Sequence, residues 1–146
     1  MTHNWFKETE PVENAVVAIT MFADAYDHLL DSLSEHAEFA GELRAEIYKP
    51  VRLSGVGSIS IYEIGIAHSP NNKLGGRFSI DREKLEKALE KRGGEIASLF
   101  AKEDDGLLPR LCALLSGFIE HADDGETRTA CIRLLNECRR LLILME

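Results

Sequence analysis

The segment that decides the fold is IGIAHSPNNKLGGRFSIDREKLEKAL, residues 64–89. Apolar residues alternate with small or polar ones over positions 64–67 and again over 78–81, as expected for strands that bury one face. Between these stretches, the proline and two asparagines of positions 70–72 supply turn chemistry. The segment therefore predicts a β-hairpin with a long loop.

Asp81, at the end of the hairpin, predicts the start of a helix. Its carboxylate can accept the free amide hydrogens of a first helical turn, which is the role of an N-cap residue. A helical spacing of apolar residues follows at Leu85, Ala88 and Leu89. The glycines at 93–94 are expected to end this helix, and residues 95–101 to form a short apolar turn with Phe100 as a core plug.

A second strong signal lies upstream, where residues 12–49 contain no proline and a single glycine, Gly41. Proline at position 11 is a helix-entry signal, and Pro50 is a stop signal. One face carries a stripe that only His36 interrupts, formed by Ala15, Ile19, Phe22, Tyr26, Leu29, Leu33, His36, Ala40, Leu43 and Ile47. An unbroken helix here would be about 55 to 60 Å long and would exceed the diameter of a compact domain. Its ends must project, kink or meet partners, and Gly41 is the expected position of a kink or break.

The carboxy-terminal part predicts two further helices after a flexible link at residues 54–58. One opens after residues 104–106, carries Pro109 in its first turn and is closed by residues 123–125. The last runs from Glu126 toward Met145, with apolar residues at heptad spacing, namely Cys131, Leu134, Cys138, Leu141 and Met145.

The expected fold class is mainly α with a small β-hairpin, in which the long first helix packs against the carboxy-terminal helices. Residues 1–11 are expected to form a polar tail, which Trp5 and Phe6 could dock onto the core. Residues 12–146 are expected to form a single helical domain, with the hairpin inserted at about residues 59–81.

Composition limits the classes of partner. The chain has 17 basic and 25 acidic residues among 146, a net charge of −8, which disfavours nucleic acid and anionic lipid as ligands. No apolar run approaches the roughly 20 residues that span a bilayer, and the start lacks the apolar core of a signal peptide. The odd set Cys112, Cys131 and Cys138 lies at apolar helical positions, as expected for buried free thiols in a reducing cytoplasm.

No residue is proposed as catalytic, cofactor-binding or metal-binding, and no cofactor is expected. The histidines show no metal-ligand spacing; they are His3, His28, His36, His68 and His121. A row of Asp24, Asp27, His28, Asp31 and Glu35 could in principle hold a metal or act in acid–base chemistry, but a solvated helix face is the better interpretation. The DDG sequences at 104–106 and 123–125 lack the remaining ligands of a calcium loop, and the paired glycines at 75–76 and 93–94 lack a phosphate-loop context.

Several motifs follow one another in an order that points to a family. They are FADAYD (22–27), GEL (41–43), IYEIGI (61–66), GRFSID (76–81), KL (84–85), AL (88–89), LF (99–100) and DDGL (104–107). Over roughly residues 12–125 this order resembles the carboxy-terminal region of the flagellar filament cap protein, also called flagellar hook-associated protein 2. The three cysteines and the short span between Tyr26 and Pro50 depart from the family pattern and indicate a reduced or partial relative.

The resemblance implies a non-enzymatic part of the bacterial flagellum. Members of this family sit at the filament tip outside the cell, oligomerise through helical segments and help flagellin to fold and insert. It implies that the partners are further copies of the chain and possibly flagellin or another flagellar protein. The surface that would pack against them is the final helix together with Ile19, Phe22, Tyr26, Leu29 and Leu33.

A second hypothesis is a cytoplasmic adaptor or chaperone-like module that binds a partner helix without catalysis. The three cysteines favour this alternative, because thiols stay reduced in the cytoplasm. An enzyme assembled from distant residues is a third possibility, but it would need a polar pocket that the sequence does not locate.

Overall fold

The computed structural model describes residues 9–33, 35–53, 57–68, 78–103, 105–121 and 125–145. These residues form five α-helices, one short 3-10 helix and two small antiparallel ribbons, so the predicted fold class is confirmed. The elements in chain order are α1 Thr9–Ser32, α2 Ala37–Tyr48, β1 Val51–Arg52, β2 Ser58–Ile59, η1 Ile61–Ile64, β3 Ile66–His68, β4 Phe78–Ile80, α3 Arg82–Ala101, α4 Leu107–Ile119 and α5 Gly125–Met145.

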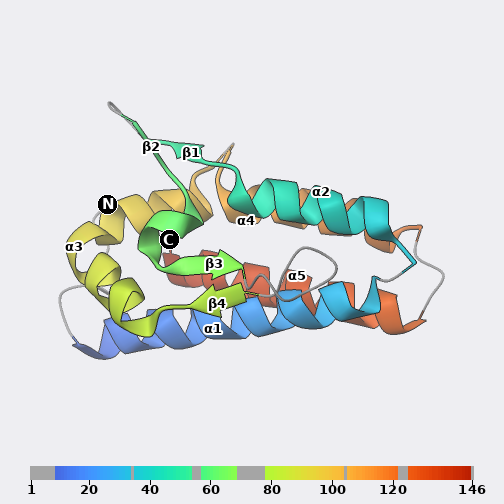
Figure 1. Cartoon of the computed structure of the whole chain (residues 1–146), viewed down its shortest axis with the longest axis horizontal. Helices are drawn as coiled ribbons and strands as arrows, with labels where there is room; N and C mark the ends of the chain where they lie inside the picture. Colours follow the sequence, from blue (N-terminus) through green and yellow to red (C-terminus); the bar gives the residue numbers. More distant parts are fainter. Residues whose placement is uncertain are drawn as a thin grey trace.

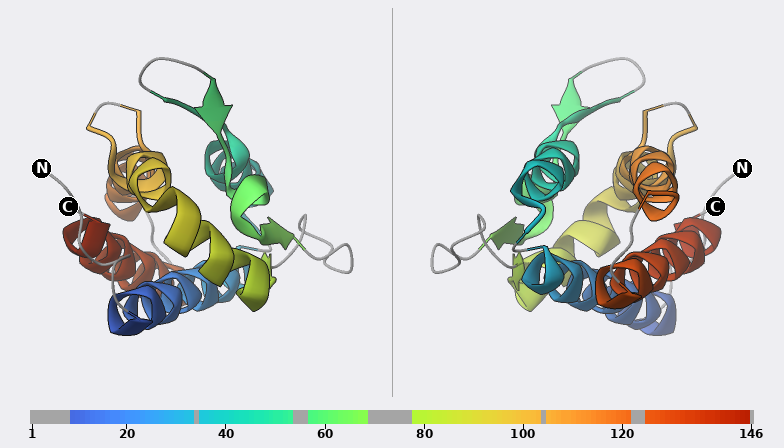
Figure 2. Two further views of the ribbon diagram at one scale, coloured as in Figure 1. Left: turned by 90° about the vertical axis from the view of Figure 1, so that its left-hand side faces the viewer. Right: turned by 90° about the vertical axis from the view of Figure 1, so that its right-hand side faces the viewer.

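The helices lie in two pairs, α1 beside α5 and α2 beside α4, with α3 crossing between the pairs at one end (Figures 1 and 2). The first and last helices run antiparallel. The hydroxyl of Thr127, at the start of α5, donates to the carbonyl of Ser32 at 3.1 Å, and Nη1 of Arg140 lies 4.0 Å from the sulfur of Met21. The predicted packing of the first helix against the carboxy-terminal helices is therefore confirmed.

The prediction of one helix over residues 12–49 is wrong. The helix begins at Thr9 and ends at Ser32, and α2 begins at Ala37 and runs back in the opposite direction (Figure 1). The amide of His36 donates to the carbonyl of Leu33 at 2.9 Å in a tight turn, and His36 has non-helical angles, φ −129° and ψ 51°.

Gly41, the expected kink, lies inside α2 instead. The break at residues 33–36 has a physical reason, because a 38-residue helix would measure about 57 Å against a domain diameter of roughly 40 Å. Reversal of the chain lets both halves of the stripe face one core. Every member of the stripe is buried except His36, which is half-buried.

The predicted hairpin is present as β3 paired antiparallel with β4, in the register Ile66 to Ile80, Ala67 to Ser79 and His68 to Phe78. Its loop at residues 69–77 lies outside the described residues. Ile64 belongs to η1 and not to the strand, because Gly65 ends η1 in the left-handed region at φ 93°. The carbonyl of Gly65 accepts the amide of Asp81 at 2.8 Å, which joins the hairpin base to the start of α3.

Asp81 caps α3 as predicted, since its carboxylate accepts the amide of Lys84 at 3.1 Å. The helix breaks directly before the predicted glycines, at Arg92, where φ is −127°, but a second helical segment continues to Ala101 in place of the expected turn. The Arg92 side chain bonds Glu95 at 2.6 Å and lies 3.6 Å from Glu63 on η1. Continuation past the kink buries the apolar residues that had been expected in a turn, namely Ile96, Ala97, Leu99 and Phe100.

A second ribbon flanks the expected flexible link, of which residues 54–56 lie outside the described residues. Strands β1 and β2 pair antiparallel, Val51 with Ile59 and Arg52 with Ser58, and both apolar members of the ribbon are buried. The amide of Leu53 donates to the carbonyl of Gly57 at 3.0 Å, and Gly57 has a φ of 79°. A positive φ is a conformation that glycine adopts without strain.

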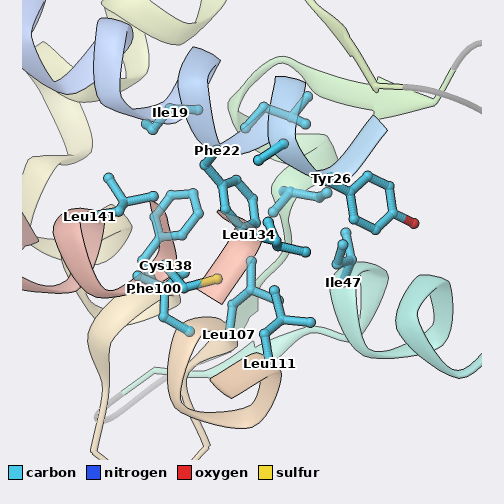
Figure 3. Packing of buried hydrophobic residues seen from close by; sticks show 14 of the residues in the cluster. Ile19, Phe22, Tyr26, Ile47, Phe100, Leu107, Leu111, Leu134, Cys138 and Leu141 are labelled. Atoms are coloured by element: carbon cyan, nitrogen blue, oxygen red, sulfur yellow. The ribbon is translucent and has the colours of Figure 1, made fainter. Parts of the chain in front are cut away.

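The core joins residues from both helix pairs (Figure 3). Phe100 is fully buried, edge-on to Phe22 at a centroid distance of 6.4 Å, which confirms the predicted plug. The heptad residues of α5 are buried as well: Cys131, Leu134, Cys138, Leu141 and Met145. Trp5, Phe6 and the aspartates of the 123–125 motif lie outside the described residues.

Replacement of Asp81 by Ala is expected to lower the free energy of unfolding by about 0.5 to 2 kcal/mol, because it leaves the amide of Lys84 without its acceptor. Urea unfolding followed by circular dichroism measures the effect. Asp81→Asn should retain most of the stability, since an asparagine side chain also caps. Equal losses in both variants would contradict the capping role.

Replacement of Gly65 by Ala is expected to cost more than about 1 kcal/mol. The residue has positive φ, and an added Cβ would lie 3.0 Å from the backbone oxygen of Asp81. Gly41→Ala is the opposite case, because nothing lies within 4 Å of the added Cβ in α2, and it should gain about 0.5 to 1 kcal/mol. If Gly41→Ala lowered the free energy of unfolding in the same urea experiment, glycine would be required at this position.

Candidate functional site

The row of Asp24, Asp27, His28, Asp31 and Glu35 divides into four exposed residues and one anchor, and Glu35 lies beyond the end of α1. Asp24, His28, Asp31 and Glu35 are exposed, in agreement with a solvated face. Asp27 is half-buried, and its Oδ1 accepts the backbone amide of Phe78 at 2.9 Å. Spacing could not reveal this bond, because it joins residues that are far apart in the chain.

The hairpin is held to α1 by aromatic packing around this bond. The ring of Phe78 lies 4.5 Å from that of Tyr26 and 6.2 Å from that of Phe22, between ring centroids. Tyr48 at the end of α2 lies 6.3 Å away and stacks on Tyr62 of η1 at 4.6 Å. Burial raises the pKa of Tyr26 and of Tyr48, so both phenols stay neutral at physiological pH. By packing together, these aromatic rings hold α1, α2 and the hairpin in place.

The remaining motifs that might carry chemistry serve packing. Asp105 lies 3.4 Å from Nζ of Lys102, and its carbonyl accepts Nε of Arg110 at 3.0 Å. Arg110 also bonds Glu46 at 2.6 Å with its side chain largely buried, which ties α4 to α2. Asp104 and the glycines at 75–76 lie outside the described residues, whereas the pair at 93–94 lies within α3.

The described histidine side chains take no part in a metal-binding group. His28 and His121 are exposed, and His36 meets the ring of Phe118 edge-on at 5.4 Å. His3 and the side chain of His68 lie outside the description. Among the described residues, no group of three or more His, Cys, Asp or Glu side chains could hold a metal ion, and no helix is long and apolar enough to cross a membrane.

The apolar stripe that had been expected to meet other subunits is not on the surface. Its five members, Ile19, Phe22, Tyr26, Leu29 and Leu33, are all buried in the core of this chain. The prediction fails because α5, α3 and β4 of the same chain pack against these residues of α1. An interaction surface must therefore use other residues of these helices.

The exposed large apolar residues of the two long helices form what we call the α1–α5 outer face: Val17 and Met21 on α1, and Ile132 and Ile143 on α5. Val17 lies one turn from Met21, and Ile143 lies one turn from Arg140, which contacts Met21. Ile143 is 73% exposed and Val17 is 52% exposed. Single exposed apolar side chains are common on protein surfaces, so their exposure alone does not establish a contact.

The same two helices carry opposite charges toward solvent. Four arginines are exposed on α5, although the chain as a whole is acidic: Arg128, Arg133, Arg139 and Arg140. Exposed acids line α1, namely Glu13, Asp24 and Asp31. The α1–α5 outer face therefore combines exposed apolar side chains with exposed acids on α1 and exposed arginines on α5.

Replacement of Asp27 by Ala is expected to destabilise the fold by about 1.5 to 3 kcal/mol, because the partly buried amide of Phe78 loses a charged acceptor. Hydrogen exchange at the Phe78 amide should accelerate before global unfolding. Asp24→Ala, an exposed aspartate of the same helix, is the matched control and should change stability by less than about 0.5 kcal/mol. Unchanged exchange at Phe78 would contradict the anchoring role of Asp27.

Comparison with known proteins places the chain in a family. The family model of the flagellar hook-associated protein 2 C-terminus matches residues 37–139, from the start of α2 to within α5. Flagellar hook-associated protein 2 of Halalkalibacterium halodurans is 41% identical over 64 residues, which are 44% of this chain and 11% of that protein.

The chain thus matches only a small part of this relative, and no solved structure matches it. The motif at residues 22–27 precedes the region that the family model matches, whereas the motifs from residue 41 to residue 107 fall within it. The match confirms the resemblance expected from their order: the chain belongs to the family of the flagellar hook-associated protein 2 C-terminus.

Proposed function

We propose that this chain is a structural assembly protein of the bacterial flagellum that acts by helix-mediated protein contacts and not by catalysis. The observation that carries this proposal is the family match over residues 37–139. By analogy with the family, its role is capping of the filament and assistance to flagellin assembly, at the flagellum outside the cell. The matched relative is much longer than this chain, so the role of the whole relative is extended here to a chain that matches a small part of it.

The α1–α5 outer face is the surface that we assign to this role. Its apolar side chains would be covered by a neighbouring copy, and the arginines of α5 in one copy would meet the acids of α1 in the next. Complementary charge orients such an encounter, while the apolar residues supply most of its free energy. A face that meets a copy of itself gives an isologous contact, in which α5 of each copy lies on α1 of the other, with two-fold symmetry.

One observation favours the second candidate, a cytoplasmic adaptor or chaperone-like module. All three cysteines are free thiols. Free thiols are the usual state in the cytoplasm, whereas they tend to oxidise outside the cell. In this alternative, the α1–α5 outer face would bind a helix of a cytoplasmic partner.

The place of action can be tested in a flagellated host. An epitope-tagged chain is expected in purified flagella and in a complex with flagellin. Absence from flagella, together with a stable complex with a cytoplasmic protein, would contradict the flagellar proposal and support the adaptor.

Self-association can be tested by light scattering after gel filtration at tens of micromolar. The unmodified chain is expected to elute as an oligomer and Ile143→Glu as a smaller species, because a charge placed in an apolar contact is costly. Ser116→Glu, on an exposed position of α4, changes the net charge by the same amount and should leave the oligomer intact. A monomer before any substitution, or equal effects of both variants, would contradict this assignment.

A further inference from the structure

Two cysteines meet between the helices of the carboxy-terminal hairpin. Helices α4 and α5 pack together, and Nη1 of Arg128 near the start of α5 donates to the carbonyl of Ile119 at the end of α4 at 3.2 Å. Because the two helices run antiparallel from this contact, Cys112, about two turns back on α4, comes beside Cys138 further along α5, where each sulfur influences the acidity of the other. Cys138 is fully buried in the core (Figure 3), whereas Cys112 is half-buried and within reach of solvent.

The two sulfurs differ in acidity. The hydrogen bond from Cys138 lowers the pKa of Cys112 to about 7, with a further contribution from Arg139 that burial partly offsets. The same bond, burial and the charge of Glu137 raise the pKa of Cys138. Cys112 is therefore the more acidic of the two thiols, and Cys138 is the proton donor beside it.

The third cysteine provides an internal reference. Cys131 is fully buried on α5, and burial raises its pKa to about 11. A thiol with this pKa is almost entirely protonated at neutral pH and is a poor nucleophile. The chain thus contains one activated sulfur, one sulfur next to it and one inert sulfur.

We propose that Cys112 and Cys138 form a dithiol site that low-molecular-weight disulfides oxidise to a reversible intrachain disulfide between α4 and α5. The arrangement matches that of redox-sensitive sites, in which an accessible thiolate stands next to a resolving cysteine. The site is independent of the proposed flagellar function, since it requires only these two helices.

The chemistry consists of two exchange steps. The thiolate of Cys112 attacks one sulfur of the small disulfide, the bond between its two sulfurs breaks, and one small thiolate leaves. Cys138 then gives up its proton, its sulfur attacks the Cys112 sulfur of the mixed disulfide, and the second small thiolate leaves. The two protein thiols lose two electrons in total, the small disulfide gains them, and the released protons go to the two small thiolates.

Oxidised glutathione is the probe for the reduced, full-length chain. Intact mass after incubation at pH 7.5 is expected to fall by about 2 Da, the loss of two hydrogens on disulfide formation. Peptide mapping should join Cys112 to Cys138 and leave Cys131 as a thiol. A stable glutathione adduct on Cys112 without the internal bond, or modification of Cys131 at the same rate, would overturn the proposal.

Three single variants separate the roles of the sulfurs. Cys138→Ser is expected to accumulate the glutathione adduct on Cys112, because no sulfur remains to resolve it. Cys112→Ser should resist oxidation, and Cys131→Ser, the matched control, should still form the bond. Formation of an internal bond in Cys112→Ser would also overturn the pairing.

Alkylation of the unmodified chain by iodoacetamide gives a measurement that does not depend on any variant folding. Labelling of Cys112 is expected to be half-maximal near pH 7 and that of Cys131 near pH 11, when peptides are quantified by mass spectrometry. In Cys138→Ala, the pH at which labelling of Cys112 is half-maximal should rise, since alanine cannot donate a hydrogen bond to the Cys112 sulfur. An equal midpoint for Cys112 and Cys131 in the unmodified chain would contradict the activation of Cys112.

Discussion

The structure depends on burial of one apolar stripe that is too long for the domain that contains it. Residues 15–47 carry it at helical spacing, and no single core of this size could cover so long a straight helix. The chain reverses after Leu33, and α2 returns so that Ala40, Leu43 and Ile47 join the same core as Ile19 and Phe22. The antiparallel contact of α1 with α5 and the pairing of α2 with α4 follow from this reversal.

The reversal also decides which residues face outward. Because the chain covers its own stripe, the surface of α1 and α5 consists of the opposite sides of these helices, where Val17 and Ile143 stand among charged residues. The proposed contact with other subunits is smaller and more polar than an open apolar stripe would be. Such a surface suits a protein that is stable before it assembles.

Local rules account for what was predicted well. The β3–β4 hairpin, the Asp81 cap and the heptad face of α5 depend on neighbours within a few residues, and each is present. The features that spacing missed depend on distant partners. Asp27 bonds Phe78 on the hairpin, Arg110 bonds Glu46 on another helix, and α3 passes its glycines because the residues beyond them reach the core.

The sequence by itself determined the helical class, the hairpin, the capped helix and membership of the family, because periodicity, capping and motif order are written in consecutive residues. Only the tertiary structure decided where the first helix breaks, which apolar face remains exposed and which cysteines meet. These features depend on how much buried area each alternative gains across the whole chain, a quantity that no local pattern contains. The pairing of Cys112 with Cys138 illustrates this, since it exists only because α4 and α5 pack together.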